Sequence, residues 1–301
     1  MPTLKWYRLV FKQLSPIHIG NFRWGVVNQT EIFIPGQVVW GALVKRYMEL
    51  KGITSNREIE EIKKRFEVIS NFFPSLDGEK ILEPRYKDGE FYLGNFSERE
   101  FRFLFTFADF RTSIEPILRK AKDEHLYEFE YILPFPIKEN LKSLKRRGEK
   151  GRDLENLERS LKERNPLRWI GIIGIPKNDE DIKRFLKEGL KVWIGGDTKY
   201  GLGKMVLENV GEISEENLLK EWNVTPEGAL DYSETKSIRN FISVDYLEEI
   251  EQGELKLLVK LIFDKNIPKV ERECTNFYAW VGSVVKVKNC LPTLKCGKFT
   301  I

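Results

Sequence analysis

The hydrophobic residues at the start of the chain follow first a strand-like pattern and then a helical one. Residues 4–13 (LKWYRLVFKQ) are rich in β-branched and aromatic side chains, which favour a strand. A break at Pro35 and Gly36 precedes a stretch with helical spacing, and Gly52 is a suitable end for that helix. The apolar face of the predicted helix consists of Val39, Leu43, Tyr47 and Leu50.

The same alternation of patterns continues up to about residue 210. Strands are expected at residues 91–93, 101–107, 126–133, 169–175, 192–194 and 205–207, and helices at residues 55–69 and 179–188. The strand at 101–107 is predicted because phenylalanine occupies every second position there. Residues 21–29 are expected to form a loop. The order strand-helix-strand-strand-helix-strand indicates an α+β fold with a ferredoxin-like core.

The domain organisation follows from where this pattern is interrupted and where it stops. Residues 1–210 are predicted to form one ferredoxin-like domain that carries an insertion at residues 138–168. Residues 211–301 contain strand patterns at 255–263 and 284–287. This last part is either a β-rich extension of the first domain or a second, smaller domain. The sequence is therefore consistent with one ferredoxin-like domain or with two.

The composition is that of a globular protein, with 41% hydrophobic and 32% charged residues. Many charged residues together with only three Cys and three Met are typical of a thermophile's surface. No apolar run is long enough for a membrane span, and the first residues lack the apolar core of a signal peptide, so we expect a cytoplasmic protein. Three cysteines without C-x-x-C spacing and only two histidines argue against a disulfide framework and against a metal site.

The positive charge is concentrated in the insertion. Residues 138–168 hold eleven Lys+Arg and six Asp+Glu, a net charge of +5, while the whole chain carries +4 and the remainder therefore −1. Phe135 and Trp169 flank this stretch and are candidates for stacking on unpaired bases. A charge run is usually a solvated surface, but its concentration favours RNA contact through Lys145, Arg146 and Arg147.

A glycine-rich turn in residues 192–210 (VWIGGDTKYGLGKMVLENV) is the most distinctive stretch of the chain. Its glycines are Gly195, Gly196, Gly201 and Gly203. Strand-like flanks predict a hairpin-like turn in which the backbone comes close to another group. Lys199, Tyr200 and Lys204 add two cations and a ring, which suit a polyanion that carries bases. The alternative is an ordinary β-hairpin whose glycines only supply positive φ.

This turn does not fit the glycine motifs that bind nucleotide cofactors. A P-loop requires Ser or Thr after its lysine, but Lys204 is followed by Met205, and Thr198 occupies the position of the leading glycine. In the dinucleotide fingerprint a glycine would stand where this chain has Val206. We therefore expect no cofactor.

Three stretches, in this order, resemble the RAMP superfamily of CRISPR-associated proteins. They are residues 15–20 (SPIHIG), 34–43 (IPGQVVWGAL) and 195–203 (GGDTKYGLG), with weaker likenesses at residues 111–114 and 126–130. The resemblance implies a ferredoxin-like, RRM-related fold. It further implies a subunit of a type III effector complex, a ribonucleoprotein of antiviral defence that holds CRISPR RNA together with other effector subunits.

The chain also departs from the family pattern. Target-cutting backbone subunits of this family carry an aspartate in the loop before the helix, and residues 23–30 contain none. Gln37 and Val38 replace the usual serine pair, and Trp40 replaces a lysine. An RNA-binding structural subunit is therefore a better expectation than an enzyme.

The alternative function is a metal-independent endoribonuclease that processes CRISPR RNA with His18 as general acid or base. We favour a structural role for His18, as a turn histidine hydrogen-bonded to the backbone. Outside the insertion and the glycine-rich turn, the candidates for RNA contact are Arg23, Lys45, Arg46 and Arg111.

Overall fold

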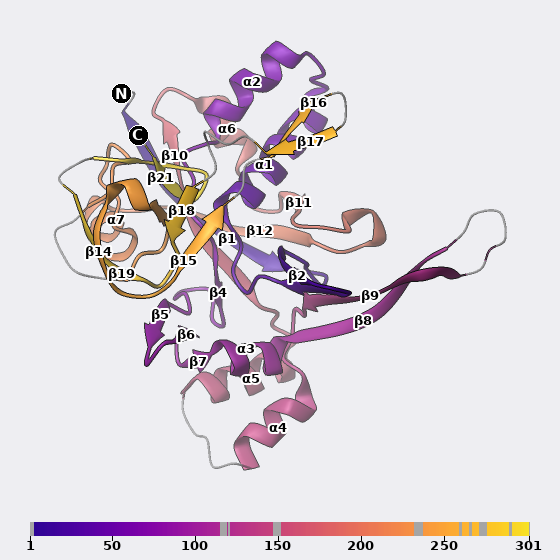
Figure 1. Ribbon diagram of the computed structural model, residues 1–301. Helices are drawn as coiled ribbons and strands as arrows, with labels where there is room; N and C mark the ends of the chain where they lie inside the picture. The colour runs from indigo at the N-terminus through magenta and orange to yellow at the C-terminus, as the bar shows by residue number, and fades with distance from the viewer. Residues whose placement is uncertain are drawn as a thin grey trace.

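The structure is a computed structural model (Figure 1). It describes residues 3–114, 119, 121–146, 152–231, 237–258, 261–264, 267–270, 276–288 and 291–300. The fold is a mixed α+β arrangement of several sheets, with helices on the surface of the central sheet.

The central sheet has five antiparallel strands in the order β11-β12-β1-β10-β4. These strands are β1 (Leu4–Gln13), β4 (Phe73–Ser75), β10 (Arg168–Pro176), β11 (Lys191–Trp193) and β12 (Lys204–Glu212). β10 is buried on both faces over nearly its whole length, which explains its continuous apolar sequence. The prediction of a first strand at residues 4–13 is confirmed.

Three helices accompany this sheet: α1 (Gly36–Lys51), α2 (Asn56–Arg65) and α6 (Glu180–Phe185). α1 ends at Gly52, which has φ 66° and ψ 30°, the left-handed conformation that glycine adopts at little cost. Its buried face includes Val39, Leu43 and Tyr47, as predicted, whereas Leu50 is exposed.

The prediction of a strand at residues 101–107 is wrong. Residues Glu98–Phe105 form the helix α3, and β8 begins only at Thr106. Ser97 and Glu100 form a capping box that satisfies backbone N–H groups at the helix start. Phe101, Leu104 and Phe105 are buried together, so that the decisive spacing of the apolar residues is helical and not alternating.

The predicted loop at residues 21–29 is also wrong. This stretch forms a hairpin of β2 (Gly20–Trp24) and β3 (Val27–Thr30) around Gly25, and β3 pairs with β9. β8 (Thr106–Ile114) and β9 (Ala121–Ile132) complete this four-stranded sheet. Their antiparallel ribbon projects well beyond the rest of the molecule (Figure 1).

The basic insertion contains two helices, α4 (Lys138–Arg146) and α5 (Arg152–Glu163). They lie beside α3, at the end of the molecule opposite to α2 (Figure 1). A small sheet of β5 (Pro84–Lys87), β6 (Glu90–Leu93) and β7 (Phe96–Ser97) leads into α3.

The C-terminal part begins with α7 (Glu215–Trp222) and continues in short strands. A five-stranded sheet has the order β15-β18-β13-β21-β20, formed by Leu255–Leu258, Asn276–Ala279, Phe241–Ser243, Lys298–Thr300 and Thr293–Lys295. Two further pairs are β14 (Leu247–Gln252) with β19 (Val284–Val287), and β16 (Leu261–Asp264) with β17 (Ile267–Val270). The single strand predicted at 255–263 is thus two strands, β15 and β16.

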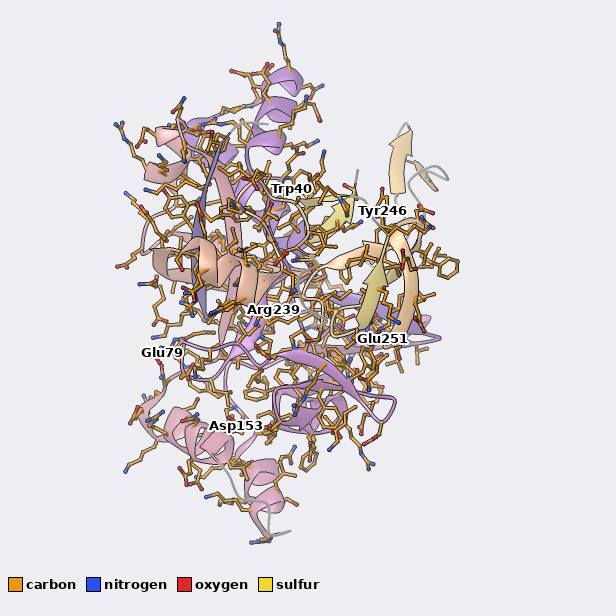
Figure 2. All side chains as sticks on the ribbon, turned by 90° about the vertical axis from the view of Figure 1, so that its left-hand side faces the viewer. Trp40, Glu79, Asp153, Arg239, Tyr246 and Glu251 are labelled. Atoms are coloured by element: carbon orange, nitrogen blue, oxygen red, sulfur yellow. The ribbon has the colours of Figure 1, made fainter. Side chains whose placement is uncertain are left out.

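The C-terminal part packs against the first part through apolar and hydrogen-bonded contacts. The ring of Phe33 lies 5.9 Å from that of Phe241 and 5.7 Å from that of Trp280. The side-chain amide of Asn71 donates to the carbonyl oxygens of Arg239 and Gly297. Figure 2 shows Tyr246 and Glu251 on the C-terminal part, away from Asp153 of α5.

Two negative observations concern the described residues only. None of their helices is both long and apolar enough to span a membrane. Nor do they bring together three or more His, Cys, Asp or Glu side chains in a way that could hold a metal ion.

Candidate nucleic-acid interface

The glycine-rich turn is a hairpin that lies against the segment after β1. β11 and β12 pair as predicted, with Trp193 opposite Lys204, and a short 3-10 turn (Thr198–Tyr200) lies between them. The backbone N–H of Gly203 donates to the carbonyl of Pro16 over 2.8 Å, and that of Gly196 donates to His18 over 2.9 Å. The two stretches that resemble the RAMP superfamily at residues 15–20 and 195–203 are therefore neighbours.

The glycines of the turn have two different surroundings. A Cβ built on Gly195 would lie under 3.0 Å from the carbonyl oxygen of His18, and a Cβ on Gly203 equally close to that of Ile194. Gly201 has φ 90°, and a Cβ there would have nothing within 4 Å. At Gly195 and Gly203 the close approach is thus to the chain's own backbone, and Gly201 is the position with open space around it.

Arg111 connects the projecting β8–β9 ribbon to the turn. Its guanidinium donates to the carboxylate of Asp197 over 2.8 Å and lies 4.2 Å from the ring centre of Phe129. Asp197 has φ 52°, a conformation that costs free energy for a residue with a side chain. The ion pair, in which both side chains are partly exposed, holds this residue in place.

His18 is packed beneath this ion pair and is only 8% exposed. Its ring lies 4.1 Å from that of Phe129, and its Nδ1 is 2.7 Å from the carbonyl oxygen of Glu130. Because a carbonyl only accepts, Nδ1 carries the proton and donates. Burial lowers the pKa of His18 below its ordinary value of 6.5, so the ring is neutral at pH 7.

A cleft of about 340 Å³ separates the turn from α1. Lys45 and Arg46 of α1 line it from one side, and Trp193, Thr198 and Lys199 line it from the other. The guanidinium of Arg46 lies 6.0 Å from the Trp193 ring and pairs with Glu49, also on the cleft wall, at 3.2 Å. Its Nε is buried and has no hydrogen-bond partner among the described residues. Three cations from stretches about 150 residues apart in the sequence therefore converge on one concave surface.

The outer side of the turn is also open to solvent. Tyr200 is 80% exposed, whereas the side chain of Lys204 is half-buried. The backbone of Lys204 is held by the first motif, since its N–H donates to the Ser15 hydroxyl and its carbonyl accepts from Leu14. Tyr200 is thus the exposed aromatic residue of the turn. The backbone hydrogen bonds of Lys204 hold the end of the turn against residues 14 and 15.

The candidates in the insertion lie elsewhere. Lys145 forms an ion pair with Glu158 of α5, and Arg146 is exposed at the end of α4, far from the glycine-rich turn (Figure 1). Arg147 lies outside the described residues, and Arg23 is placed in β2 with its side chain outside them. Trp169 is wholly buried and donates to Gln13, so the prediction that it stacks on bases is wrong.

Sequence reasoning missed the exposed aromatic residues on the ribbon. Phe110 of β8 is 72% exposed, and Phe107 is exposed near the base of the ribbon. Phe110 lies opposite Glu128 on β9. Phe107 belonged to the phenylalanine alternation that predicted a strand, but its exposure and that of Phe110 follow from the projection of the ribbon, which no local pattern contains.

Comparisons with known proteins show that chains of two solved structures share the fold of this chain. No family model matches the chain, and no curated protein is similar to it in sequence. Its structure is similar to a chain in the cryo-EM structure of the Type III-B Cmr-beta bound to cognate target RNA and AMPPnP. The TM-score is 0.56 at 13% identity, over 93% of this chain and 86% of that one.

A second structure, the Type III-B Cmr-beta bound to cognate target RNA, contains a chain that matches with a TM-score of 0.53. Identity is again 13%, over 93% of this chain and 86% of that one. At this level of identity the likeness shows the fold and nothing further.

Proposed function

We propose that this protein is an RNA-binding structural subunit of a type III-like CRISPR effector complex, and a member of the RAMP superfamily. Its partners would be CRISPR RNA and other effector subunits. The observation that carries the proposal is the likeness of fold over 93% of the chain to a chain of an RNA-bound Cmr-beta assembly. The motifs at residues 15–20, 34–43 and 195–203 point in the same direction.

The strand order supports a ferredoxin-like, RRM-related core. In the sheet, β12 and β10 flank β1, and β4 lies beyond β10. With α1 between β1 and β4, and α6 between β10 and β12, the chain follows a β-α-β-β-α-β path with insertions. Residues 211–301, which have a five-stranded sheet of their own, form the smaller second unit of the proposal.

The RNA contact proposed for this core is the cleft between α1 and the glycine-rich turn. Lys45, Arg46 and Lys199 supply positive charge on a concave surface, which attracts phosphates. Tyr200 on the turn and Phe110 on the ribbon are exposed rings on which unpaired bases can stack. Stacking on rings is tolerant of sequence, so we expect modest sequence preference along most of the bound RNA.

The test is the salt dependence of the affinity for single-stranded RNA, measured by fluorescence anisotropy. Each contacted phosphate is expected to contribute about 0.7 to the slope of log Kd against log salt concentration. Three cations at the cleft therefore predict a slope of about 2 or more. An affinity that does not change with salt would exclude phosphate contacts and overturn the proposal.

A further inference from the structure

A second and larger cavity, of about 860 Å³, lies where the two parts of the chain meet. Val38 of α1 lines it on the N-terminal side, and Phe241, Leu257 and Trp280 line it on the C-terminal side. Glu31, next to β3, and Lys256 of β15 are charged residues on opposite walls. Its size is that of a site for a small ligand, and its walls combine apolar side chains with four charged ones, Glu31, Glu98, Lys256 and Lys298.

Glu31 is a carboxylate buried in the wall of this cavity. It is 6% exposed, and its Oε1 accepts from the N–H of Ile32 over 3.2 Å. Among the described residues, the N–H of Ile32 is the hydrogen-bond donor found for this carboxylate, and no Lys or Arg forms an ion pair with it. Burial raises the pKa of Glu31, and the charge of Lys256 opposes this. A buried carboxylate without an ion-pair partner is costly unless a donor fills the cavity.

Glu98, the second carboxylate on the cavity wall, differs from Glu31 because it is paired with a cation. Glu98, which lines the same cavity, forms an ion pair with Arg102 at 2.7 Å. Arg102 also contacts Glu130 at 2.9 Å, so it is already engaged by two carboxylates. Glu98 is thus partly exposed and paired with a cation, whereas Glu31 is the buried carboxylate on the wall of the cavity.

We propose that this cavity binds a guanine base of the RNA, with Glu31 accepting hydrogen bonds from N1–H and from the 2-amino group. This inference rests on the proposed function. A carboxylate has two oxygens and only accepts, so it fits an edge with two adjacent N–H donors. Adenine and cytosine carry a ring nitrogen that accepts hydrogen bonds beside their amino group. A carboxylate oxygen would be repelled by that ring nitrogen. Lys256 and Lys298 favour an anionic nucleotide over an arginine side chain of a protein partner.

Free nucleotides test the cavity without long RNA. GMP, IMP and AMP are titrated against the protein by calorimetry; IMP lacks the 2-amino group and AMP lacks both donors. We expect GMP to bind about tenfold more tightly than AMP, with IMP between them. Equal affinities for GMP and AMP, or tighter binding of methylguanidine than of GMP, would overturn the inference.

The variant Glu31→Gln tests the residue. It removes a buried charge at constant size, so the melting temperature is expected to be unchanged or higher. GMP affinity should fall about tenfold, while AMP affinity stays the same. Glu139→Gln, at an exposed site on α4, is the matched control and should bind GMP like the parent. Parent-like GMP binding by a folded Glu31→Gln would refute the assignment.

A pair of RNAs separates this inference from the proposed function. One is all uridine and the other contains guanines at intervals, with equal length. If both bind equally and with strong salt dependence, the guanine site is wrong and the proposed function stands. If GMP is selected but neither RNA binds, the site stands and the proposed function is wrong.

Discussion

The glycine-rich turn and the α4–α5 insertion are both basic in sequence, but the structure organises their charges differently. At the turn, Lys199 faces Lys45 and Arg46 across a cleft, and backbone hydrogen bonds to residues 15–20 fix its position. In the insertion, Lys145 is paired with Glu158 of the neighbouring helix, and Arg146 is exposed at a helix end. Arg46 is paired with Glu49 at 3.2 Å, as Lys145 is with Glu158, so the difference lies in the arrangement: cations from two distant stretches face one cleft at the turn, whereas Lys145 and Arg146 belong to one helix.

If RNA binds at the cleft as proposed, a net charge counted along the chain does not locate the binding surface. A phosphate is held where several cations converge on one surface. Residues 138–168 carry +5 in sequence, yet six acidic residues are mixed with the basic ones. The turn has few charges, but the fold brings α1 to it.

The largest effect is expected from Gly195→Ala. A Cβ at this position would meet the His18 carbonyl under 3.0 Å, at a backbone φ of 89°. The free energy of unfolding should fall by more than about 3 kcal/mol, measured by urea denaturation. The cause is the loss of the close contact between the turn and residues 15–20, on which the organisation of this region depends.

Gly201→Ala is the matched control, because φ is 90° there but a Cβ would have open space around it. Only the backbone cost remains, about 1 kcal/mol. If the two variants lost the same stability, the close approach at Gly195 would not be what fixes the turn.

The second prediction compares the two basic regions directly. Lys45→Ala/Lys199→Ala should weaken RNA binding about tenfold at moderate salt and reduce the salt slope by about 1.4. Lys145→Ala/Arg146→Ala removes the same formal charge and should change the affinity less than about twofold. Exposed lysines add little to folding, so the melting temperatures of both variants should remain within a few degrees of the parent.

Anisotropy titrations at several salt concentrations measure both pairs of substitutions on one RNA. A larger loss in the insertion variant than in the cleft variant would reverse the comparison. It would assign the RNA to α4 and α5.

Much of the core could be predicted because its apolar patterns are long and regular. The first strand at residues 4–13 and the helix ending at Gly52 are confirmed, since each is one strong periodic stretch with a clear boundary. The helix at Glu98–Phe105 was missed because four phenylalanines at alternate positions suggest a strand. There the capping box of Ser97 and Glu100, a local signal, outweighs the alternation.

The site was less predictable than the fold. The glycine-rich turn was found because its sequence is unusual, and its hairpin is confirmed. The cleft depends on α1 and the turn meeting in space, and no local pattern contains that contact. The buried position of Glu31 likewise follows from the packing of β15 and Trp280 against the first part of the chain.

A third and smaller effect concerns pH. Burial lowers the pKa of His18 in the folded state, so below its ordinary pKa of 6.5 the unfolded chain binds the proton more readily. Stability should therefore fall as the pH drops from about 7.5 to about 5.5, and part of this fall should vanish in His18→Asn. The measurement is urea denaturation at both pH values. Equal pH dependence of parent and variant would show that His18 is not held neutral under the Arg111–Asp197 pair.

The smallest expected effect is on RNA cleavage, where we predict none. The Nδ1–H of His18 is engaged by the Glu130 carbonyl, the ring packs on Phe129, and its lowered pKa leaves little of the cation that a general acid needs. Labelled CRISPR repeat RNA, incubated with the parent and with His18→Ala, should remain intact in both samples, with or without divalent metal. Glu139→Gln serves as a preparation control for contaminating nucleases. Specific cutting by the parent that disappears in His18→Ala but persists in the control would make this chain an endoribonuclease, and the glycine-rich turn would then be part of an active site.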